Sequence, residues 1–312
     1  MRGRIRRCRR QSGMVLVAVM WAIAALALLA AALAGAARGE IASLTVFRTQ
    51  AQAEAIGDAA IQLALIQMKT AEGPPKGYET KEINFDDHPV SVRITPVGGL
   101  IDVNAAPEEL LRDLFVYGAG LAPDAATTLA QRVIDWRDPD QTPLPFGAED
   151  DAYAAAGVAA RPRNEPATVP ADLLQVLGMS YEVYARILPM ITIESGQAII
   201  DPGSAPPEVL AVLAHGDTGQ ANSISAALAS GNPTADLTAI RGRFTAGRGV
   251  SASSKFRLQA SVSMPDGRRL VRAWWVDTSS STMGGPPWKV LRTEAVTGEQ
   301  DAPSISDETP HA

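Results

Sequence analysis

Carboxylates gather in one short segment of this chain. Residues 135–153, DWRDPDQTPLPFGAEDDAY, carry six carboxylates and a single arginine. Prolines and a glycine separate the acids, which is typical of an irregular loop. Three interpretations fit such a segment: a catalytic acid/base pair, a metal site, or a solvated acidic loop without a task.

If the segment binds a metal, calcium is the ion to expect. Calcium takes about six to eight hard oxygen ligands, and alternating acids in an irregular loop can wrap it. Asp138 and Asp140 have suitable spacing, and Glu149 with Asp150 can close the loop from its far side. Zinc is disfavoured because no cysteine or histidine lies nearby. The segment is not an EF-hand, since its glycine and its last glutamate fall outside that register.

The remaining residues of the segment support such a site or pack beside it. Asp135 is expected to cap the end of the preceding helix, or to support the site without binding the metal. Asp151 is equally consistent with a ligand and with a solvated side chain, and Tyr153 is expected to pack.

Catalysis by paired carboxylates finds little support. A hydrolase of that kind needs two acids held apart across a cleft in distinct environments. The sequence marks no nucleophile and no aromatic subsite, and its histidines, His88, His215 and His311, are scattered.

The first residues of the chain decide its compartment. Six arginines and no acid occupy residues 1–13, and an uncharged run follows at residues 14–37. That run is long enough to cross a bilayer core of about 30 Å as a helix, and it is too long for the core of a typical cleaved signal. The positive-inside rule keeps the arginines cytoplasmic and sends the C-terminal body across the membrane.

The charge and cysteine content of the body limit its partners and its stabilising bonds. Without the six arginines of the leader, the net charge changes from −6 to −12. A body this acidic repels nucleic acid. The single cysteine, Cys8, lies in the leader, so the body forms no internal disulfide.

The junction RRQSG|MVLVAVMW resembles a prepilin signal. The resemblance implies that prepilin peptidase cuts between Gly13 and Met14 and that the new N-terminus at Met14 is methylated. Most pilin-like subunits carry a glutamate at the fifth mature position, where its carboxylate neutralises the N-terminal amine of the subunit above. Here that position is Ala18, which favours a place at the filament tip, because an unpaired carboxylate is costly in lipid.

Beyond the membrane run, the pattern predicts a stem helix, a short β segment, a helical block and a second β segment. Apolar residues at helical spacing continue to Met68, Val90, Val92 and Ile94 alternate in a hairpin, and a second hairpin covers residues 254–277. The order fits an α+β fold, pilin-like, with a long N-terminal helix, an antiparallel β-sheet and a large α-helical domain inserted in the sheet region. We expect these divisions: leader 1–13, membrane and stem helix 14–70, first β part 71–100, helical domain 101–215, second β part 216–297 and a disordered tail 298–312.

Two features of the helical block invite further interpretation. LIDVNAAPEELLRDLF has a near copy in IIDPGSAPPEVLAVLA, which indicates a possible duplication of a small helical unit. VPADLLQVLGMSYEVYARILP has the pattern of a helix-hairpin-helix module, a motif that often binds DNA through hairpin amides. The alternative function is therefore a membrane-anchored DNA-binding protein for DNA uptake, although the hairpin has no Lys or Arg before Arg186.

The segments GLIDVNAAPEELL, VIDWRDPD, GAEDDAY and LLQVLGM, in this order behind such a leader, resemble the K-type minor pseudopilins of the type II secretion system. The resemblance implies a non-enzymatic, single-pass inner-membrane protein with a cytoplasmic N-terminus and a periplasmic body. It also implies that the protein caps the pseudopilus tip with the minor pseudopilins I and J, and helps to initiate assembly for export of folded periplasmic proteins. The family binds structural calcium, so the metal interpretation of Asp138, Asp140, Glu149 and Asp150 becomes the preferred one.

Overall fold

The computed structural model describes residues 12–70, 75, 77–86, 88–230, 237, 240, 242, 244–245, 253–279 and 285–298; for residues 12–14 and 33–44 it describes the backbone alone. The α+β class expected from the sequence is confirmed. The helices are α1 (Ser12–Thr70), α2 (Glu108–Asp113), α3 (Pro123–Arg137), α4 (Asp150–Ala155), α5 (Tyr181–Ile187), α6 (Pro207–Leu213) and α7 (Thr218–Ala229), with a π-helical turn η2 (Leu114–Gly118) and short 3₁₀ turns η1 (Val97–Gly99), η3 (Pro170–Gln175) and η4 (Leu188–Met190). The strands are β1 (Glu79–Phe85), β2 (His88–Pro96), β3 (Ile101–Asp102), β4 (Ile191–Thr192), β5 (Lys255–Ser263), β6 (Arg269–Asp277) and β7 (Lys289–Gly298).

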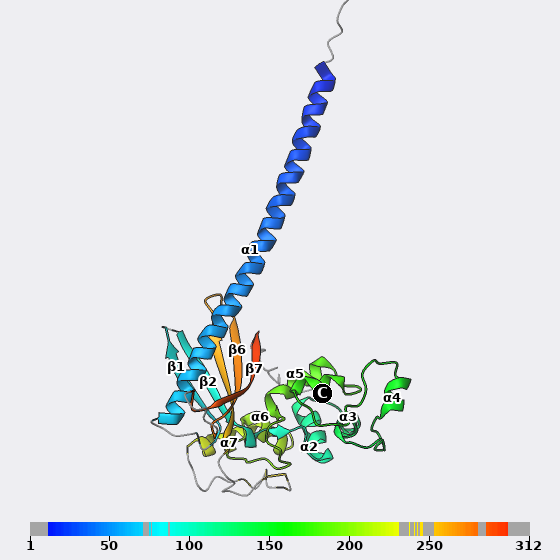
Figure 1. Ribbon diagram of the computed structural model, residues 1–312, viewed down its shortest axis with the longest axis vertical. Coiled ribbons are helices and arrows are strands. Elements are labelled where there is room, and N and C mark those ends of the chain that lie inside the picture. Colours follow the sequence, from blue (N-terminus) through cyan, green and yellow to red (C-terminus); the bar gives the residue numbers. More distant parts are fainter. Residues whose placement is uncertain are drawn as a thin grey trace, which may run out of the picture. The chain divides into compact units, whose positions relative to one another are not determined.

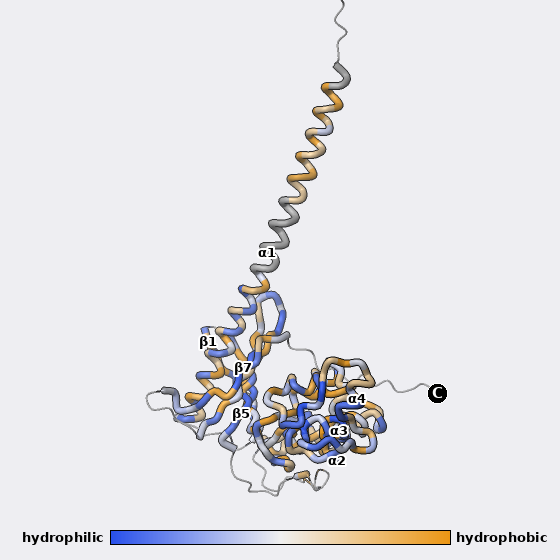
Figure 2. Tube along the Cα trace, turned by 45° about the vertical axis from the view of Figure 1, so that its right-hand side comes forward, coloured by the Kyte–Doolittle hydropathy of each residue, from blue (hydrophilic) through white to orange (hydrophobic). Residues whose placement is uncertain are grey.

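Helix α1 contains the predicted membrane run. Its segment Val15–Ala32 has a mean hydropathy of 2.7, and none of it is buried within the chain (Figure 2). This segment is long and apolar enough to cross a membrane. Residues 1–11 of the predicted leader lie outside the described residues, as do residues 299–312 of the predicted tail.

The sheet shows that the helical block is an insertion. Its strand order is β1-β2-β5-β6-β7, and every neighbouring pair is antiparallel. Strand β2 ends at Pro96, which pairs with Phe256 of β5, so residues 97–254 leave and re-enter the sheet at neighbouring positions. Both hairpins predicted from alternating apolar residues are confirmed, and residues 289–298 add the edge strand β7.

The C-terminal part of α1 covers one face of this sheet (Figure 1). Ile61, Leu65 and Met68 are buried against it, as the helical spacing predicts. Gly57 permits the close approach, because a Cβ there would lie 2.8 Å from the Cβ of Arg272. The helix is thus packed against β6 without a gap for a side chain at this point.

A buried ion pair fixes the same contact. Arg272 of β6 donates from Nε to Asp58 Oδ1 of α1 at 2.6 Å, and Trp274 Nε1 donates to the same oxygen at 2.7 Å. Glu54, one turn earlier in α1, lies 3.0 Å from Arg272 Nη2. The stem helix is therefore held to the sheet by charge as well as by apolar packing.

The opposite face of the sheet meets the helical block. Trp275 is buried in the core of that block and lies between two guanidinium groups, with Arg292 at 4.6 Å and Arg257 at 5.4 Å from its ring centroid. Its Nε1 donates to Glu294 Oε1 at 2.6 Å, and Arg257 donates to Glu294 Oε2 at 3.0 Å. Adjacent tryptophans therefore serve opposite faces, as strand alternation predicts.

The near copies in the helical block have the same local structure. Asp102 Oδ1 accepts the N–H of Asn104, and Asp201 Oδ1 accepts the N–H of Gly203. In each copy a short helix, α2 or α6, begins six residues after the aspartate and follows a proline in extended conformation. The division predicted at residue 215 separates α6 from α7, whereas both helices pack into the one core of the block, and the sheet resumes only at Lys255.

Candidate metal centre

The acidic loop begins where α3 ends. Asp138 is the first residue beyond α3 and is extended (φ −82°, ψ 158°), as expected of a residue before Pro139. Asp140 turns the chain by accepting the N–H of Thr142 at 2.7 Å. The chain returns at Glu149, which precedes α4. One carboxylate oxygen from each of Asp138, Asp140 and Glu149 lies within 4.8 Å of the other two.

Asp135 holds the loop in this shape. It is fully buried in α3, and its two carboxylate oxygens accept the N–H of Leu144 at 3.3 and 3.1 Å. Its carboxylate fills the space beside Gly147, where a Cβ would lie 1.7 Å from Asp135 Oδ2. This position agrees with the expectation that Asp135 supports the site without binding the metal. Position 147 has room only for glycine.

Gln131, one turn earlier in α3, fixes the loop at a second point. Its Oε1 accepts the N–H of Phe146 at 2.7 Å, and its Nε2 donates to Glu108 of α2 at 2.8 Å. Gln131 was not among the residues predicted for the site. The helical period of 3.6 residues could have identified it, because that period places Gln131 on the same side of α3 as Asp135.

The arginine of the segment points elsewhere. Arg137 donates to the carbonyl of Ala106 at 2.6 Å and also to that of Val103. Both contacts join α3 to the turn before α2. The arginine therefore makes its hydrogen bonds with main chain, and its charge only partly offsets the burial and the like charges that raise the pKa of Asp138.

Glu149 lies in an unfavourable environment for a charge. Its side chain is buried, and among the described residues neither of its carboxylate oxygens has a hydrogen-bond partner. Asp138 Oδ1 likewise has no partner in that part of the chain. Burial, followed by the negative charges of Asp135 and Asp138, raises the pKa of Glu149 to about 7. The pKa of Asp138 is raised as well, by burial and by Asp140. The group therefore contains more negative charge than its surroundings compensate.

A hard divalent cation fits these oxygens. Asp138, Asp140 and Glu149 offer carboxylate oxygens of the type that calcium prefers, and no cysteine or histidine joins the group among the described residues. A cation there would supply the missing partner of the buried oxygens.

The structure does not bring Asp150 into this group. Its carboxylate lies 3.5 Å from Arg161 Nη1, and its side chain is half exposed. Of the four predicted ligands, the structure therefore groups three, and Asp150 lies beside the group. The reason is that Asp150 starts α4 and its side chain turns outward. Asp151 is exposed. Tyr153 is buried and its hydroxyl accepts the N–H of Leu177 at 2.9 Å, so the packing expected for it is confirmed.

Comparisons with known proteins find matches to protein K of type II secretion. A family model described as type II secretion system (T2SS), protein K, matches residues 99–195. A type II secretion system protein K from Klebsiella pneumoniae is 24% identical over 228 residues, which are 66% of this chain and 70% of that protein. Residues 99–195 thus match the protein K family of type II secretion, and about two thirds of the chain is similar to a protein K.

Two further relatives extend the comparison. A protein K from Pectobacterium carotovorum subsp. carotovorum is 35% identical over 85 residues, 27% of this chain and 26% of that protein. The crystal structure of the GspK-GspI-GspJ complex from enterotoxigenic Escherichia coli matches with a TM-score of 0.50 and 15% identity, covering 82% of this chain and 98% of the matched chain. This solved structure shows that the fold is shared.

Each of two helix–helix turns in the matched domain is held by an arginine from another helix. The hairpin between η3 and α5 donates the N–H of Leu177 to Tyr153, and its carbonyl accepts Arg132 Nη1 of α3 at 3.0 Å. In return Arg186 of α5 donates to the carbonyl of Ala119, in the turn before α3, at 2.7 Å. Both arginines therefore bind main chain within the domain, which weighs against the DNA-binding alternative, since that mode uses hairpin amides and nearby basic residues on a phosphate backbone.

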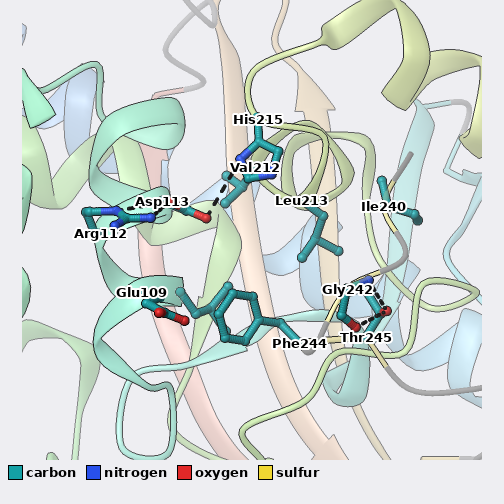
Figure 3. A pocket seen from close by; sticks show the side chains of 11 residues that line it. Glu109, Arg112, Asp113, Val212, Leu213, His215, Ile240, Gly242, Phe244 and Thr245 are labelled. Atoms are coloured by element: carbon teal, nitrogen blue, oxygen red, sulfur yellow. Dashed lines mark hydrogen bonds and ion pairs between the residues drawn. The ribbon is translucent and has the colours of Figure 1, made fainter. Parts of the chain in front are cut away.

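A cavity of about 270 Å³ lies beside α2 and the end of α6, apart from the acidic loop (Figure 3). Asp113 accepts from Arg112 at 3.0 Å and faces His215 Nδ1 at 3.9 Å, while Phe244 lines the apolar side. His215 itself has a positive φ of 54° at the end of α6. Arg112, Asp113 and His215 thus interact within this cavity, and its described lining includes no activated nucleophile.

Glu149 predicts how the stability of the metal-free protein depends on pH. Because burial raises the folded-state pKa of this carboxyl from 4.5 to about 7, the folded state loses stability as the pH rises through that interval. Glu149→Gln should remove this loss, so in chelator the variant should exceed the wild type above pH 7 by on the order of 3 kcal/mol and match it at pH 4. Urea unfolding of the detergent-solubilised chain, followed by tryptophan fluorescence, measures the difference. Asp150→Asn is the control and should leave the pH dependence in place; a wild type with a flat profile would contradict the assignment.

Proposed function

We propose that this chain is a non-enzymatic minor pseudopilin that caps the tip of the type II secretion pseudopilus with the minor pseudopilins I and J and helps to initiate its assembly. The observation that carries the proposal is the insertion of residues 97–254 between the paired strands β2 and β5, behind a helix that can cross a membrane. The arginine-rich leader would lie in the cytoplasm and the sheet and helical block in the periplasm.

The bulk of the insertion supports a capping position. A subunit inside a helical filament must accept neighbours above and below it. A domain the size of this insertion would obstruct a subunit above, whereas it is tolerated on the last subunit. Ala18, in place of the glutamate usual in pilin-like subunits, agrees with a subunit that has no neighbour above it.

The stem helix offers a surface for the partners. Leu63 and Ile66 of α1 are 36% and 47% exposed and lie three residues apart, on the side of the helix away from its own sheet. Ala55 and Ala59 continue the same stripe at helical spacing. The matched solved structure is titled as a complex of GspK with GspI and GspJ, and we infer that the corresponding partners of this chain pack along this stripe.

Charge placed on the stripe should break the tip complex. Leu63→Glu combined with Ile66→Glu should lower recovery of co-expressed I and J pseudopilins with this chain at least tenfold, because two carboxylates would be buried in an apolar contact. Gln62→Glu with Gln67→Glu adds the same charge beside the stripe and should leave recovery within about twofold. Pull-down from detergent extracts measures this. Failure of the wild-type chain to retain I and J would reject the proposed assembly.

We further propose that prepilin peptidase cuts the chain between Gly13 and Met14 and that Met14 becomes N-methylated. The support is the arginine-rich leader that ends in Gly13, directly before the apolar run.

The processing proposal predicts one N-terminal peptide. Mass spectrometry of the protein extracted from membranes should find a methylated N-terminus at Met14, and Gly13→Arg should leave the leader attached, since a bulky residue blocks the cleavage position. An intact leader on the wild-type protein, in cells that contain the peptidase, would reject the proposal.

Calcium is the proposed structural cofactor. Asp138, Asp140 and Glu149 would hold the ion, with main-chain carbonyls or water completing about six to eight ligands. When bound, the ion supplies positive charge at oxygens that otherwise lack a partner. The chain has no cysteine beyond its leader, so a cation that joins both ends of the loop would contribute cross-linking of a kind that disulfides provide in other exported proteins.

Removal of the metal should therefore destabilise the body. At a calcium concentration about 100 times the dissociation constant, binding stabilises the folded state by about 2.7 kcal/mol, so chelation should lower the melting temperature by about 5–10 °C. Asp140→Ala should abolish this shift, whereas Asp150→Ala, which removes a carboxylate outside the group, should keep it. Differential scanning fluorimetry with and without EGTA provides the measurement. A wild-type melting temperature that ignores chelator would exclude a structural ion.

A further inference from the structure

An apolar segment stands exposed in the middle of the acidic loop. Residues 143–146 read Pro-Leu-Pro-Phe, and of these Pro143, Pro145 and Phe146 are exposed while Leu144 is half-buried. The Phe146 side chain is 59% exposed. Single exposed apolar residues are common on protein surfaces, so exposure alone identifies nothing.

The main chain on both sides of Phe146 is fixed, which is unusual for an exposed loop. Its own N–H donates to the buried Gln131 at 2.7 Å, and the N–H of Leu144 donates to the fully buried Asp135. The N–H of Gly147 donates back to the carbonyl of Leu144 at 2.9 Å. Phe146 is thus held outward by main-chain contacts to α3.

Such an arrangement lowers the entropic cost of binding. Two prolines restrict the backbone before Phe146, and a phenylalanine side chain has only two rotatable bonds to order. A rigid aromatic residue with a fixed backbone is the type of group that dominates the binding energy of protein interfaces. The loop therefore has the form of an anchor rather than that of a flexible surface turn.

Charge around the segment indicates which surface it would meet. Asp151 is exposed beside it, whereas Asp140 belongs to the proposed metal site and Asp150 faces Arg161. Arg137, the basic residue of the loop, donates to main chain within the domain. A complementary surface would have an apolar pocket for the aromatic ring and lysines or arginines at its rim.

We propose that Phe146 is the anchor of a docking surface, formed by residues 140–151, for a protein whose apolar pocket is rimmed by basic side chains. The partner belongs to the secretion process, so the proposal rests on the proposed role of the chain at the pseudopilus tip. It does not depend on I and J, whose proposed contact lies on α1.

A photo-reactive residue tests the contact directly. The full chain, with p-benzoylphenylalanine at position 146, is irradiated in cells that secrete through the complete system, and the adduct is mapped by mass spectrometry. Tyr181, which is 69% exposed in the same helical block, carries the probe in the control. We expect a protein adduct from position 146 that maps to an apolar pocket flanked by Lys or Arg, at least fivefold stronger than any adduct of the same partner from position 181.

Charge reversal then tests the rim. Asp151→Lys should lower the adduct yield about threefold or more, and Phe146→Asp without the probe should reduce secretion while Phe146→Leu retains most of it. Both Phe146 variants should still co-purify with I and J and keep the chelator-dependent melting shift, which separates this contact from tip assembly and from the metal. If the wild-type chain does not retain I and J, the proposed role at the tip is rejected. If the wild-type chain retains I and J, three results would reject the docking surface: a lipid adduct at position 146, no adduct there, or a protein adduct whose yield Asp151→Lys does not change.

Discussion

Glu294 connects the three parts of the body. Its carbonyl accepts Arg272 Nη1 at 2.6 Å on the stem side of the sheet, where Arg272 also binds Asp58 of α1. Its carboxylate, on the other side, accepts from Trp275 and from Arg257, and Arg257 extends to the carbonyl of Pro189 in the helical block at 3.4 Å. One residue of an edge strand thus links stem helix, sheet and inserted domain through charge-assisted hydrogen bonds.

The charge of Glu294 is what makes this link effective. Burial opposes its ionisation, but Arg257, the hydrogen bond from Trp275 and the nearby Arg292 outweigh that effect, so its pKa is lowered. The carboxylate therefore stays ionised between two largely buried guanidinium groups. Removing one partner of such a buried group lowers the free energy of unfolding by far more than the intact group adds to it. The orientation of the helical block is therefore tied to that of the sheet.

The sequence predicted those features that depend on short-range pattern. Strand alternation located both hairpins, and the gathering of acids located Asp138, Asp140 and Glu149. It could not separate Glu149 from Asp150, because adjacent residues at the start of a helix point in different directions and spacing alone does not say which turns inward. Gln131 and Gly147 went unnoticed for a related reason, since their roles arise from contacts across the loop. The expected division at residue 215 was drawn from local pattern, which does not reveal that α7 packs by tertiary contact with α6.

The adjacency of Pro96 and Phe256 also has a consequence for the order in which the chain folds. Strand β2 is synthesised long before β5, and with the intervening chain unfolded their pairing would close a loop whose entropic cost is about 4–5 kcal/mol. A helical block that folds first, around its own core, can bring its two ends together and remove much of that cost. On this physical argument the central pairing of the sheet follows the folding of the insertion, which would then act as an internal template for the sheet that carries it.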